Sequence, residues 1–422
     1  MNQEIVYSKI HKLLMNFLCT GNRIAYFYNL TSLNLNPNKM NFKFIIAIAL
    51  LIGCQHLFGQ ENYRTASKAD TTKIYKGGPK YEVKTFTQKF KSKKPKNVIL
   101  MIGDGMGVTE VSAGITVNGG HLYLENFKHV GFSKTQSSDN YITDSAAGGT
   151  ALSSGQKTFN GAIGVNPDKM PVKTILEMAE EKGLATGLVS TSAITHATPA
   201  SFIAHQGSRG SYEDIAADFL KTDIDVFIGG GYKHFAQRKD KRDLTKELQA
   251  KRYQVLRNMD EIAKVKSGKL AGLTADEHNE VYPLRKMSLP LSTKTALNIL
   301  SQNKKGFFIM IEGSQIDFGG HANHTIYVVN EMLDFDEAIG KALEFAANDG
   351  ETLIVVTADH ETGGMALAAG NMKIGMVRGA FTSVDHTGTM VPVFAYGPGA
   401  QNFSGIQENT DIAKKIMNLL DF

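Results

Sequence analysis

The apolar positions of the chain follow two alternating patterns from residue 97 to the C-terminus. Short continuous apolar runs, typical of strands buried on both faces, alternate with stretches in which apolar residues recur every three or four positions. The runs predict strands at 97–102, 185–189, 226–228, 307–311, 353–357 and 391–395. The longer stretches predict helices at 174–181, 212–220, 293–302, 325–347 and 409–420. This alternation predicts an α/β fold with a central, mostly parallel β-sheet flanked by helices on both faces.

Acidic residues and histidines follow three of these strands at the point where each strand ends. In chain order they are Asp104, then Glu312, Asp317 and His321, and then Asp359 and His360. The carboxyl ends of parallel strands meet at one sheet edge, where open α/β sheets bind their ligands. Like charges gathered there repel unless cations neutralise them, and carboxylates mixed with imidazoles suit zinc or magnesium. Each residue alone fits a surface acid or a core histidine equally well, but the set predicts a metal cluster.

A serine in Thr143-Asp-Ser-Ala-Ala-Gly-Gly-Thr-Ala151 is a second candidate for chemistry. A short polar residue before small residues suits the start of a helix, with Asp144 as its N-cap. Backbone N–H groups and the positive end of the helix dipole would then face an incoming phosphate. A zinc ion bound to Ser145 would lower the pKa of its hydroxyl group, so that no separate base is needed. From this local sequence alone, an ordinary capped helix explains the residues better.

Six segments, in this order, closely resemble the alkaline phosphatases: 97–107, 143–165, 191–210, 312–321, 357–360 and 386–388. The most specific are the Asp-Ser-Ala-Ala sequence followed by Lys157-Thr-Phe-Asn-Gly161, and Thr357-Ala-Asp-His360. The resemblance runs from about residue 95 to the end and implies a catalytic domain at 97–422 with the three-layer sandwich of that family. It also implies hydrolysis of small phosphate monoesters to an alcohol and inorganic phosphate.

The resemblance implies a role for each matching residue. Ser145 matches the nucleophile, which forms a phosphoserine intermediate that water later hydrolyses. Arg209, in His205-Gln-Gly-Ser-Arg209, matches the arginine that grips the phosphate, because a guanidinium group can hold two phosphoryl oxygens at once. Two zinc ions and a third metal, usually magnesium, complete the implied site.

The implied metal ligands divide among three sites. Asp317, His321 and His386 match the ligands of the first zinc. Asp359 and His360 match those of the second zinc, which activates Ser145, and Asp104 matches the carboxylate that bridges this zinc and the third metal. The further ligands of the third site are matched by Glu312 and Thr198, with His196 at a variable ligand position.

Two positions vary within the family and change what is expected. His196 stands where some members have aspartate, so the third site should hold Mg²⁺ less tightly and accept Zn²⁺ or Co²⁺. Phe318 stands where relatives carry lysine, histidine or tryptophan, so phosphate should be held less tightly and leave faster. The stretch from Asp359 to His386 is short where larger relatives insert a crown. We therefore expect a compact enzyme with an open entrance, and a homodimer that lacks part of the usual interface.

The N-terminal region carries a different pattern. Residues 1–39 show no targeting signal and are interpreted as a mis-called upstream extension. Lys43 and the apolar run 44–52, which is too short to span a bilayer, predict a signal peptide at 40–60. Cys54 lies in a lipobox-like Leu-Ile-Gly-Cys sequence, which leaves a lipid anchor open, although the bulky Ile52 favours cleavage near residue 60. Either route exports the protein to the periplasm or the cell surface.

Composition narrows the class of protein, its binding partners and the types of metal ligand. With 42% hydrophobic and 21% charged residues, the 422-residue chain is ordinary for a globular protein, and a formal charge of +5 gives no warrant for nucleic-acid binding. The lysines of segment 61–96 cluster at 80–96, which predicts a solvated linker or, alternatively, a polyanion-binding arm. The only two cysteines, Cys19 and Cys54, precede the expected cleavage point, so a metal site must use histidine and carboxylate.

Other functions remain as alternatives. A phosphodiesterase or sulfatase of the same superfamily would use related metals, but Ser145 lacks the C/S-x-P-x-R context of a sulfatase. Phosphodiesterases of the superfamily lack this Asp-Ser-Ala sequence paired with the matching arginine and third-site residues. A catalytically silent phosphate-binding protein would lack the nucleophile or a ligand, and none is missing here. Five histidines outside the motifs receive no role: His121, His129, His205, His234 and His278.

Overall fold

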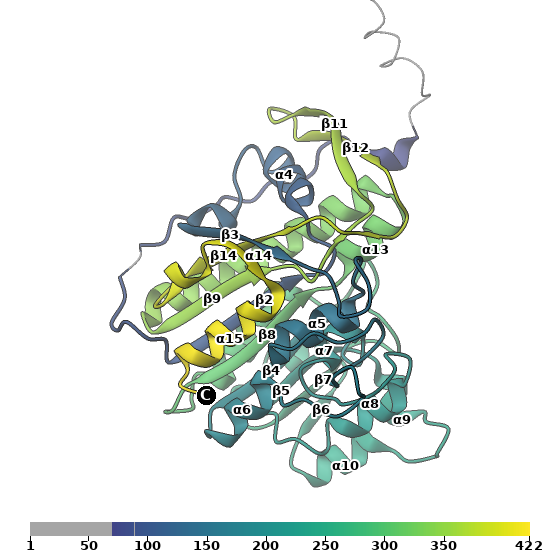
Figure 1. Cartoon of the computed structure of the whole chain (residues 1–422), viewed down its shortest axis with the longest axis vertical. Helices are drawn as coiled ribbons and strands as arrows, with labels where there is room; N and C mark the ends of the chain where they lie inside the picture. Colours follow the sequence, from purple (N-terminus) through teal and green to yellow (C-terminus); the bar gives the residue numbers. More distant parts are fainter. Residues whose placement is uncertain (1–69, 88) are drawn as a thin grey trace, which may run out of the picture. The chain divides into compact units, whose positions relative to one another are not determined.

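The computed structural model describes residues 70–87 and 89–422 (Figure 1). The predictions made for the extension 1–39, the signal peptide 40–60 and Cys54 lie outside the described residues. Among those that are described, no helix combines the length and the hydrophobicity that crossing a bilayer requires.

A ten-stranded sheet forms the centre of the domain, as the apolar runs predict. Its strands are, in spatial order, β15 (Gly405–Glu408), β3 (His129–Lys134), β14 (Val391–Tyr396), β9 (Thr352–Thr357), β2 (Asn97–Gly103), β8 (Phe307–Gly313), β4 (Ala185–Ala193), β5 (Val226–Gly230), β7 (Leu270–Leu273) and β6 (Gln254–Leu256). Only β14 runs antiparallel to its neighbours, β3 and β9, and the other neighbouring strands pair in parallel. The predicted mostly parallel sheet is confirmed.

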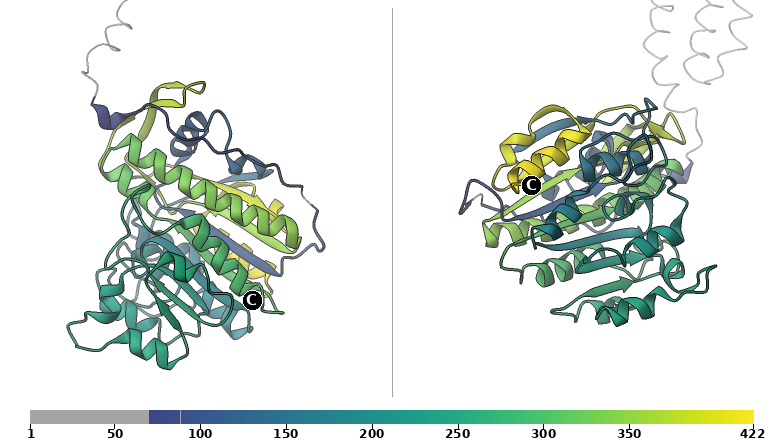
Figure 2. Two further views of the ribbon diagram at one scale, coloured as in Figure 1. Left: turned by 180° about the vertical axis from the view of Figure 1, so that it is seen from behind. Right: turned by 60° about the horizontal axis from the view of Figure 1, so that its bottom comes forward.

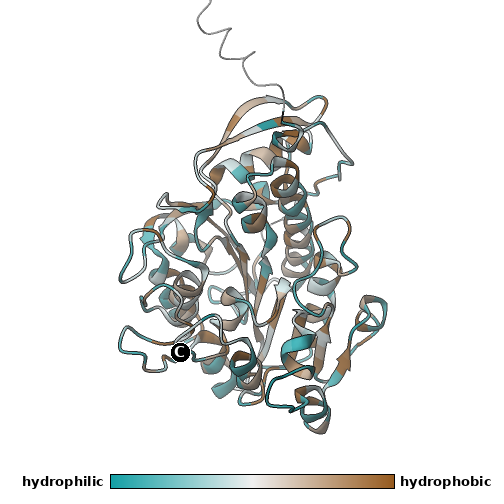
Figure 3. Ribbon diagram, turned by 90° about the vertical axis from the view of Figure 1, so that its right-hand side faces the viewer, coloured by the Kyte–Doolittle hydropathy of each residue, from teal (hydrophilic) through white to brown (hydrophobic). Residues whose placement is uncertain are grey.

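Helices cover both faces of this sheet (Figures 1 and 2), which gives the three layers expected. Alternate residues of β2 point to opposite faces, so Ile99 and Met101 join one apolar core and Leu100 joins the other. The first core is closed by α4 (Val108–Val117), α12 (Leu289–Leu300) and α14 (Thr325–Asp349). The second is closed by α5 (Ser145–Ser154), α6 (Ile175–Glu181), α7 (Ala197–Ala200), α8 (Tyr212–Asp218), α9 (Tyr232–Ala236), α10 (Leu244–Ala250) and α15 (Asn409–Leu419). Figure 3 shows apolar residues along the interior strands and polar residues in the outer loops.

Four strands of the sheet, β3, β6, β7 and β15, are not among the predicted strands, and three of them have an identifiable reason. Strand β6 is only three residues long, and β15 is largely exposed. In β3 the usual pattern is inverted, because Gly131 and Ser133 are buried while Val130 and Phe132 are exposed. Glycine is required at 131, where a Cβ would lie 2.4 Å from a backbone oxygen of the neighbouring segment. A strand whose buried face is small and polar gives no apolar alternation to detect.

The described part of segment 61–96 differs from the solvated linker that its lysines predict. Strand β1 (Ile74–Tyr75) pairs with β12 (Met376–Phe381), which forms a hairpin with β11 (Met365–Asn371). The hydroxyl group of Tyr81 donates to buried Asp336 at 2.6 Å, and the backbone N–H of Phe86 donates to a side chain of the domain at 2.8 Å. Aromatic residues spaced between the lysines therefore anchor this segment, while most of its lysines stay in solvent.

Candidate metal centre and active site

Every histidine and carboxylate predicted as a metal ligand falls into one of three groups at the carboxyl edge of the sheet. Within each group, the ligand atoms lie within 4.8 Å of one another. We call them the first group (Asp317, His321, His386), the second group (Asp104, Asp359, His360) and the third group (Asp104, His196, Glu312). The structure therefore assembles the same three sets that the sequence predicts, with Asp104 shared by two of them.

Strand ends and one helical turn deliver these ligands. Asp104 follows β2, and Glu312 lies near the end of the neighbouring strand β8. Asp317 and His321 lie four residues apart on α13 (Gln315–His321), so their side chains share one face of that helix. Gly105, with φ of 75°, lets the loop pass α13, because a Cβ there would lie 2.7 Å from the Cα of Asp317.

The first group is the one exposed to solvent, and hydrogen bonds to backbone carbonyls orient its two imidazoles for metal binding. His321 donates from Nδ1 to the carbonyl of Val384 at 2.6 Å, and His386 donates from Nδ1 to the carbonyl of Thr143 at 2.9 Å. A carbonyl can only accept, so each imidazole in its neutral form keeps a lone pair on Nε2, and the two Nε2 atoms lie 3.1 Å apart. Oδ1 of Asp317 lies 3.3 and 3.4 Å from the same two nitrogens. These three atoms converge on one point, which suits zinc.

The second group surrounds the predicted nucleophile. Ser145 Oγ lies 3.1 Å from Nε2 of His360, which also lies 3.4 Å from Asp104 and 3.2 Å from Asp359. The hydroxyl of Thr362 donates to Asp317 and is 3.2 Å from Nδ1 of His360, so it accepts from that nitrogen and leaves Nε2 free. His360 and both carboxylates are fully buried.

The third group is buried as well, but a hydrogen bond occupies the Nε2 atom of one member, His196. Thr198 Oγ1 lies 3.5 Å from Asp104, and both carboxylate oxygens of Glu312 lack a hydrogen-bond partner within the described part of the chain. Nε2 of His196 accepts from Arg209 at 3.2 Å. A guanidinium group only donates, so the proton of neutral His196 must sit on Nδ1, which is buried and has no hydrogen-bond partner among residues 70–87 and 89–422. His196 can offer Nε2 to a metal once Arg209 turns away.

Electrostatics supports divalent cations at these positions. Burial, and then the charges of the neighbouring carboxylates, raise the pKa of Asp104 well above its ordinary value. Burial raises the pKa of Glu312 to about 8 and, with the nearby charge of Arg209, lowers the pKa of His196 to about 3. Buried oxygens of Asp104, Glu312 and Asp359 have no hydrogen-bond partner among the described residues. Metal ions would satisfy these atoms and stabilise the ionised carboxylates, so the residues fit metal cofactors.

The pKa of Asp317, the carboxylate of the first group, shifts in the opposite direction from that of Asp104. Although burial acts against ionisation, the hydrogen bond from His386 and the positive charge of the surrounding imidazoles hold the pKa of Asp317 below its ordinary value. The hydrogen bond and charge of Asp317 in turn raise the pKa of His386, against the effect of burial. The carboxylate of the first group is thus ionised without a metal.

Ser145 begins α5, as predicted, and its N-cap connects it to the predicted phosphate-binding arginine. Asp144 accepts from the backbone N–H of Ala147 at 3.0 Å through one oxygen and from the N–H of Gly161 at 3.0 Å through the other. That second oxygen also accepts from Arg209 at 2.9 Å. One carboxylate therefore caps the helix and holds the guanidinium group beside the serine.

Sequence reasoning missed three features of the site. Thr362 lies two residues after His360 in β10 (Glu361–Thr362), so strand alternation could have placed both side chains on one side. The ion pair between Asp144 and Arg209 had no local signal. His278, given no role, packs edge-to-face against both His196 and Phe318, with ring centroids 5.2 Å apart in each case. The loop that carries His278 is brought to the site by tertiary packing, which the spacing of residues along the chain does not predict.

Other histidines make ordinary structural contacts. His205 bonds to Glu177 and to the carbonyl of Gly164, and His234 bonds to Thr195. His324, three residues after His321, caps α14 by accepting from the backbone N–H of Tyr327 at 3.1 Å.

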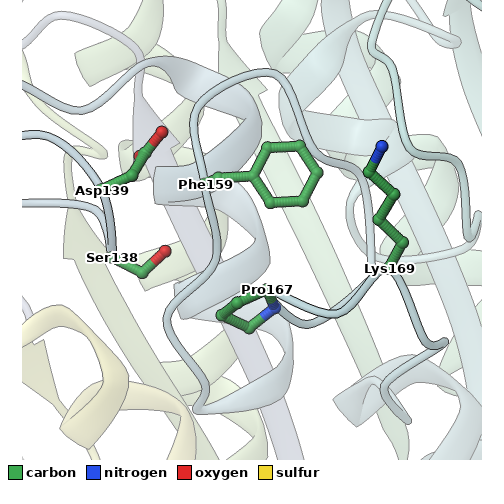
Figure 4. A pocket seen from close by; sticks show the side chains of 5 residues that line it. All are labelled: Ser138, Asp139, Phe159, Pro167 and Lys169. Atoms are coloured by element: carbon green, nitrogen blue, oxygen red, sulfur yellow. The ribbon is translucent and has the colours of Figure 1, made fainter.

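A shallow hollow lies beside the loop that supports Asp144. It has a volume of about 640 Å³ and is lined by Ser138, Asp139, Phe159, Pro167 and Lys169 (Figure 4). None of these residues belongs to the three ligand groups. Asn160, next to Phe159, accepts from the backbone N–H of Asp144 at 3.1 Å, so the hollow borders the active site without entering it.

The chain is similar to a well-defined set of known proteins. A family model described as alkaline phosphatase matches residues 95–380 and 376–422. Alkaline phosphatase 4 of Bacillus subtilis is 36% identical over 414 residues, which cover 77% of this chain and 88% of that protein. Alkaline phosphatase of Escherichia coli is 33% identical over 401 residues, covering 76% of this chain and 85% of that protein.

Solved structures agree. The alkaline phosphatase from the Antarctic bacterium TAB5 superposes with a TM-score of 0.74 at 44% identity, covering 78% of this chain and 99% of that chain. The structure of a variant of that enzyme, with aspartate in place of a histidine, is described as having Mg bound in a site called M3.

Proposed function

The chain belongs to the alkaline phosphatase family and is a phosphoric monoester hydrolase, and we propose that it acts through a phosphoserine intermediate on Ser145. The observation that carries this proposal is the position of Ser145 Oγ. It lies at the N-terminus of α5, 3.1 Å from Nε2 of His360 and beside the guanidinium group held by Asp144.

The metals are assigned from the donor sets. Zinc in the first and second groups and Mg²⁺ in the third fit an imidazole-rich open site, a buried mixed site and a site with mostly oxygen ligands. When bound, the metals would lower the pKa of the serine hydroxyl and of the attacking water and offset the charge of the phosphoryl oxygens. His196 adds an imidazole to the third site, so that site would also accept Zn²⁺ or Co²⁺.

The chain's own residues position the substrate. Ser145 Oγ attacks phosphorus, the bond from phosphorus to the alcohol oxygen breaks, and water later releases phosphate from the serine. Arg209 is held by Asp144 through one nitrogen, while its other terminal nitrogen donates to His196. That second nitrogen can turn to a phosphoryl oxygen, which would free His196 for the third metal. Phe318 offers no charge to the phosphate, which favours weaker product binding.

Location and assembly are proposed from the sequence alone. The N-terminal pattern supports export to the periplasm or the cell surface, with a possible lipid anchor at Cys54. Family resemblance supports a homodimer.

The test compares p-nitrophenyl phosphate hydrolysis at alkaline pH by wild type, Ser145→Ala and Ser154→Ala. Ser154 lies in the last turn of the same helix and serves as the matched control. Each protein is assayed as purified, after chelation, and after zinc and magnesium are restored. We expect metal-dependent turnover that Ser145→Ala loses and Ser154→Ala keeps.

Three outcomes would count against this proposal. Equal activity of Ser145→Ala would assign the attack to water. Inert wild type with full metal would favour a phosphate-binding protein. Faster hydrolysis of bis(p-nitrophenyl) phosphate than of the monoester would favour a phosphodiesterase.

A further inference from the structure

We propose that Tyr141 forms a subsite for the alcohol part of the substrate and selects aromatic alcohols. This inference rests on the proposed function and on the exposure of the first group, which alone among the three ligand groups has members that are not buried. Ser145 and the second and third groups are buried, whereas the side chain of His321 is 39% exposed. The alcohol must therefore leave the site across the first group, and the residues around that group decide what it contacts.

Two chain segments flank the first group, and both present apolar side chains to solvent. The carbonyl of Thr143 holds His386, and the carbonyl of Val384 holds His321. Val384 itself is 59% exposed, and Tyr141, two residues before Thr143, is 75% exposed. The two backbone segments that orient the imidazoles therefore also expose apolar side chains beside the first group. We call these two side chains, Tyr141 and Val384, the rim.

The ring of Tyr141 sits close to the first group. A Cβ added to Gly388 would lie 2.3 Å from a carbon of the Tyr141 ring, so the ring rests directly on the backbone of Gly388. Gly388 follows His386 by two residues, and two residues of extended chain span about 7 Å. The ring is thus within reach of an alcohol group bound next to His386.

The turn that presents Tyr141 is fixed on both sides. The side chain of Asn140 accepts from the backbone N–H of Ile142 at 3.0 Å, and the carbonyl of Ile142 accepts from Asn160 at 2.9 Å. Within the described part of the chain, the Tyr141 hydroxyl has no hydrogen-bond partner. A large aromatic ring held on a rigid turn and left in solvent is a preorganised stacking surface.

The test uses pairs of ligands that differ in whether a phenyl or a methyl group ends the alcohol part. 2-Phenylethyl phosphate and propyl phosphate have leaving groups of similar basicity, so a difference in KM reports contacts with the alcohol. The corresponding phosphonates are not hydrolysed, and calorimetric titration of the metal-loaded full chain gives their Kd without turnover. Inorganic phosphate serves as the ligand without an alcohol.

We expect wild type to bind the phenylethyl ligand about three- to tenfold more tightly than the propyl ligand. Tyr141→Ala should reduce this preference to less than twofold, and Tyr141→Phe should keep it. Phosphate binding should not change. Phe159→Ala, which removes the ring that lines the hollow of Figure 4, is the matched control and should keep the preference.

Equal preference in wild type and Tyr141→Ala would overturn the subsite, and so would loss of the preference in Phe159→Ala. A Tyr141→Ala variant that changes oligomeric state and weakens all three ligands equally would assign the ring to a subunit interface instead. If wild type hydrolyses neither ester but shows a phosphonate preference that depends on Tyr141, the subsite stands and the proposed function fails.

Discussion

The first group and the third group lie at one edge of the same sheet and are prepared for metal in opposite ways. In the first group, two backbone carbonyls set both tautomers and the carboxylate is ionised. In the third group, the carboxylates of Asp104 and Glu312 favour their protonated forms and Nε2 of His196 is occupied by Arg209. The first group is thus preorganised, whereas the third needs its cation, and release of Arg209, to become a site.

The largest effect should come from Asp104, the residue that the second and third groups share. Asp104→Asn should lower kcat/KM at least about a thousandfold and release two metals while the first remains. Metal content by mass spectrometry and steady-state kinetics check this. Asp385→Asn, next to His386, is the control because its side chain makes no hydrogen bond or ion pair with a metal-ligand residue in the described part of the chain. Retention of three metals by Asp104→Asn would remove the distinction between the groups.

Metal-free stability should depend on pH through the third group. The pKa of Glu312 is about 8 in the folded chain and 4.5 ordinarily, so folding takes up a proton between these values. Stability of the metal-free protein should therefore fall as pH rises from about 4.5 to about 8. Thermal unfolding after chelation should show a falling Tm over this window, which Glu312→Gln should flatten. A flat profile in the metal-free wild type would contradict the prediction.

A smaller effect is expected from His196. In His196→Asp, a hard anion replaces the imidazole, and the third group should reach half occupancy at about tenfold lower Mg²⁺. Equilibrium dialysis against Mg²⁺ measures this, with His278→Gln as a control for loss of an adjacent imidazole. Zinc content of the first group should not change. Equal Mg²⁺ affinity in wild type and His196→Asp would show that His196 does not limit the third site.

An effect of similar size is expected at Phe318, which packs against His196. Phe318→Lys adds a cation and should lower the inhibition constant for phosphate about tenfold, since charged hydrogen bonds contribute about 1.5–3 kcal/mol. Phe318→Met keeps an apolar side chain and should leave that constant unchanged. Unchanged phosphate inhibition in Phe318→Lys would contradict the hypothesis that this ring speeds product release.

The sequence predicts the site better than it predicts the edges of the fold. Residues such as Asp104 and His360 lie within three residues of the end of a buried strand, so local pattern and site coincide there. Strand β3 is missed because its buried residues are Gly131 and Ser133, and the anchoring of Tyr81 is missed because lysines surround it. The Arg209 pair with Asp144 and the contact of His278 depend on long-range packing, which spacing along the chain cannot encode.

The carbonyl groups that hold His321 and His386 have a consequence for how this enzyme can diversify. A backbone carbonyl is supplied by any amino acid, so positions 143 and 384 can change their side chains while the metal-binding tautomers persist. Mutational drift at the rim can then alter which alcohols the enzyme prefers without a cost in metal affinity. Selection for substrate range therefore acts on the side chains of these residues, whereas selection for metal binding acts on their backbone carbonyls.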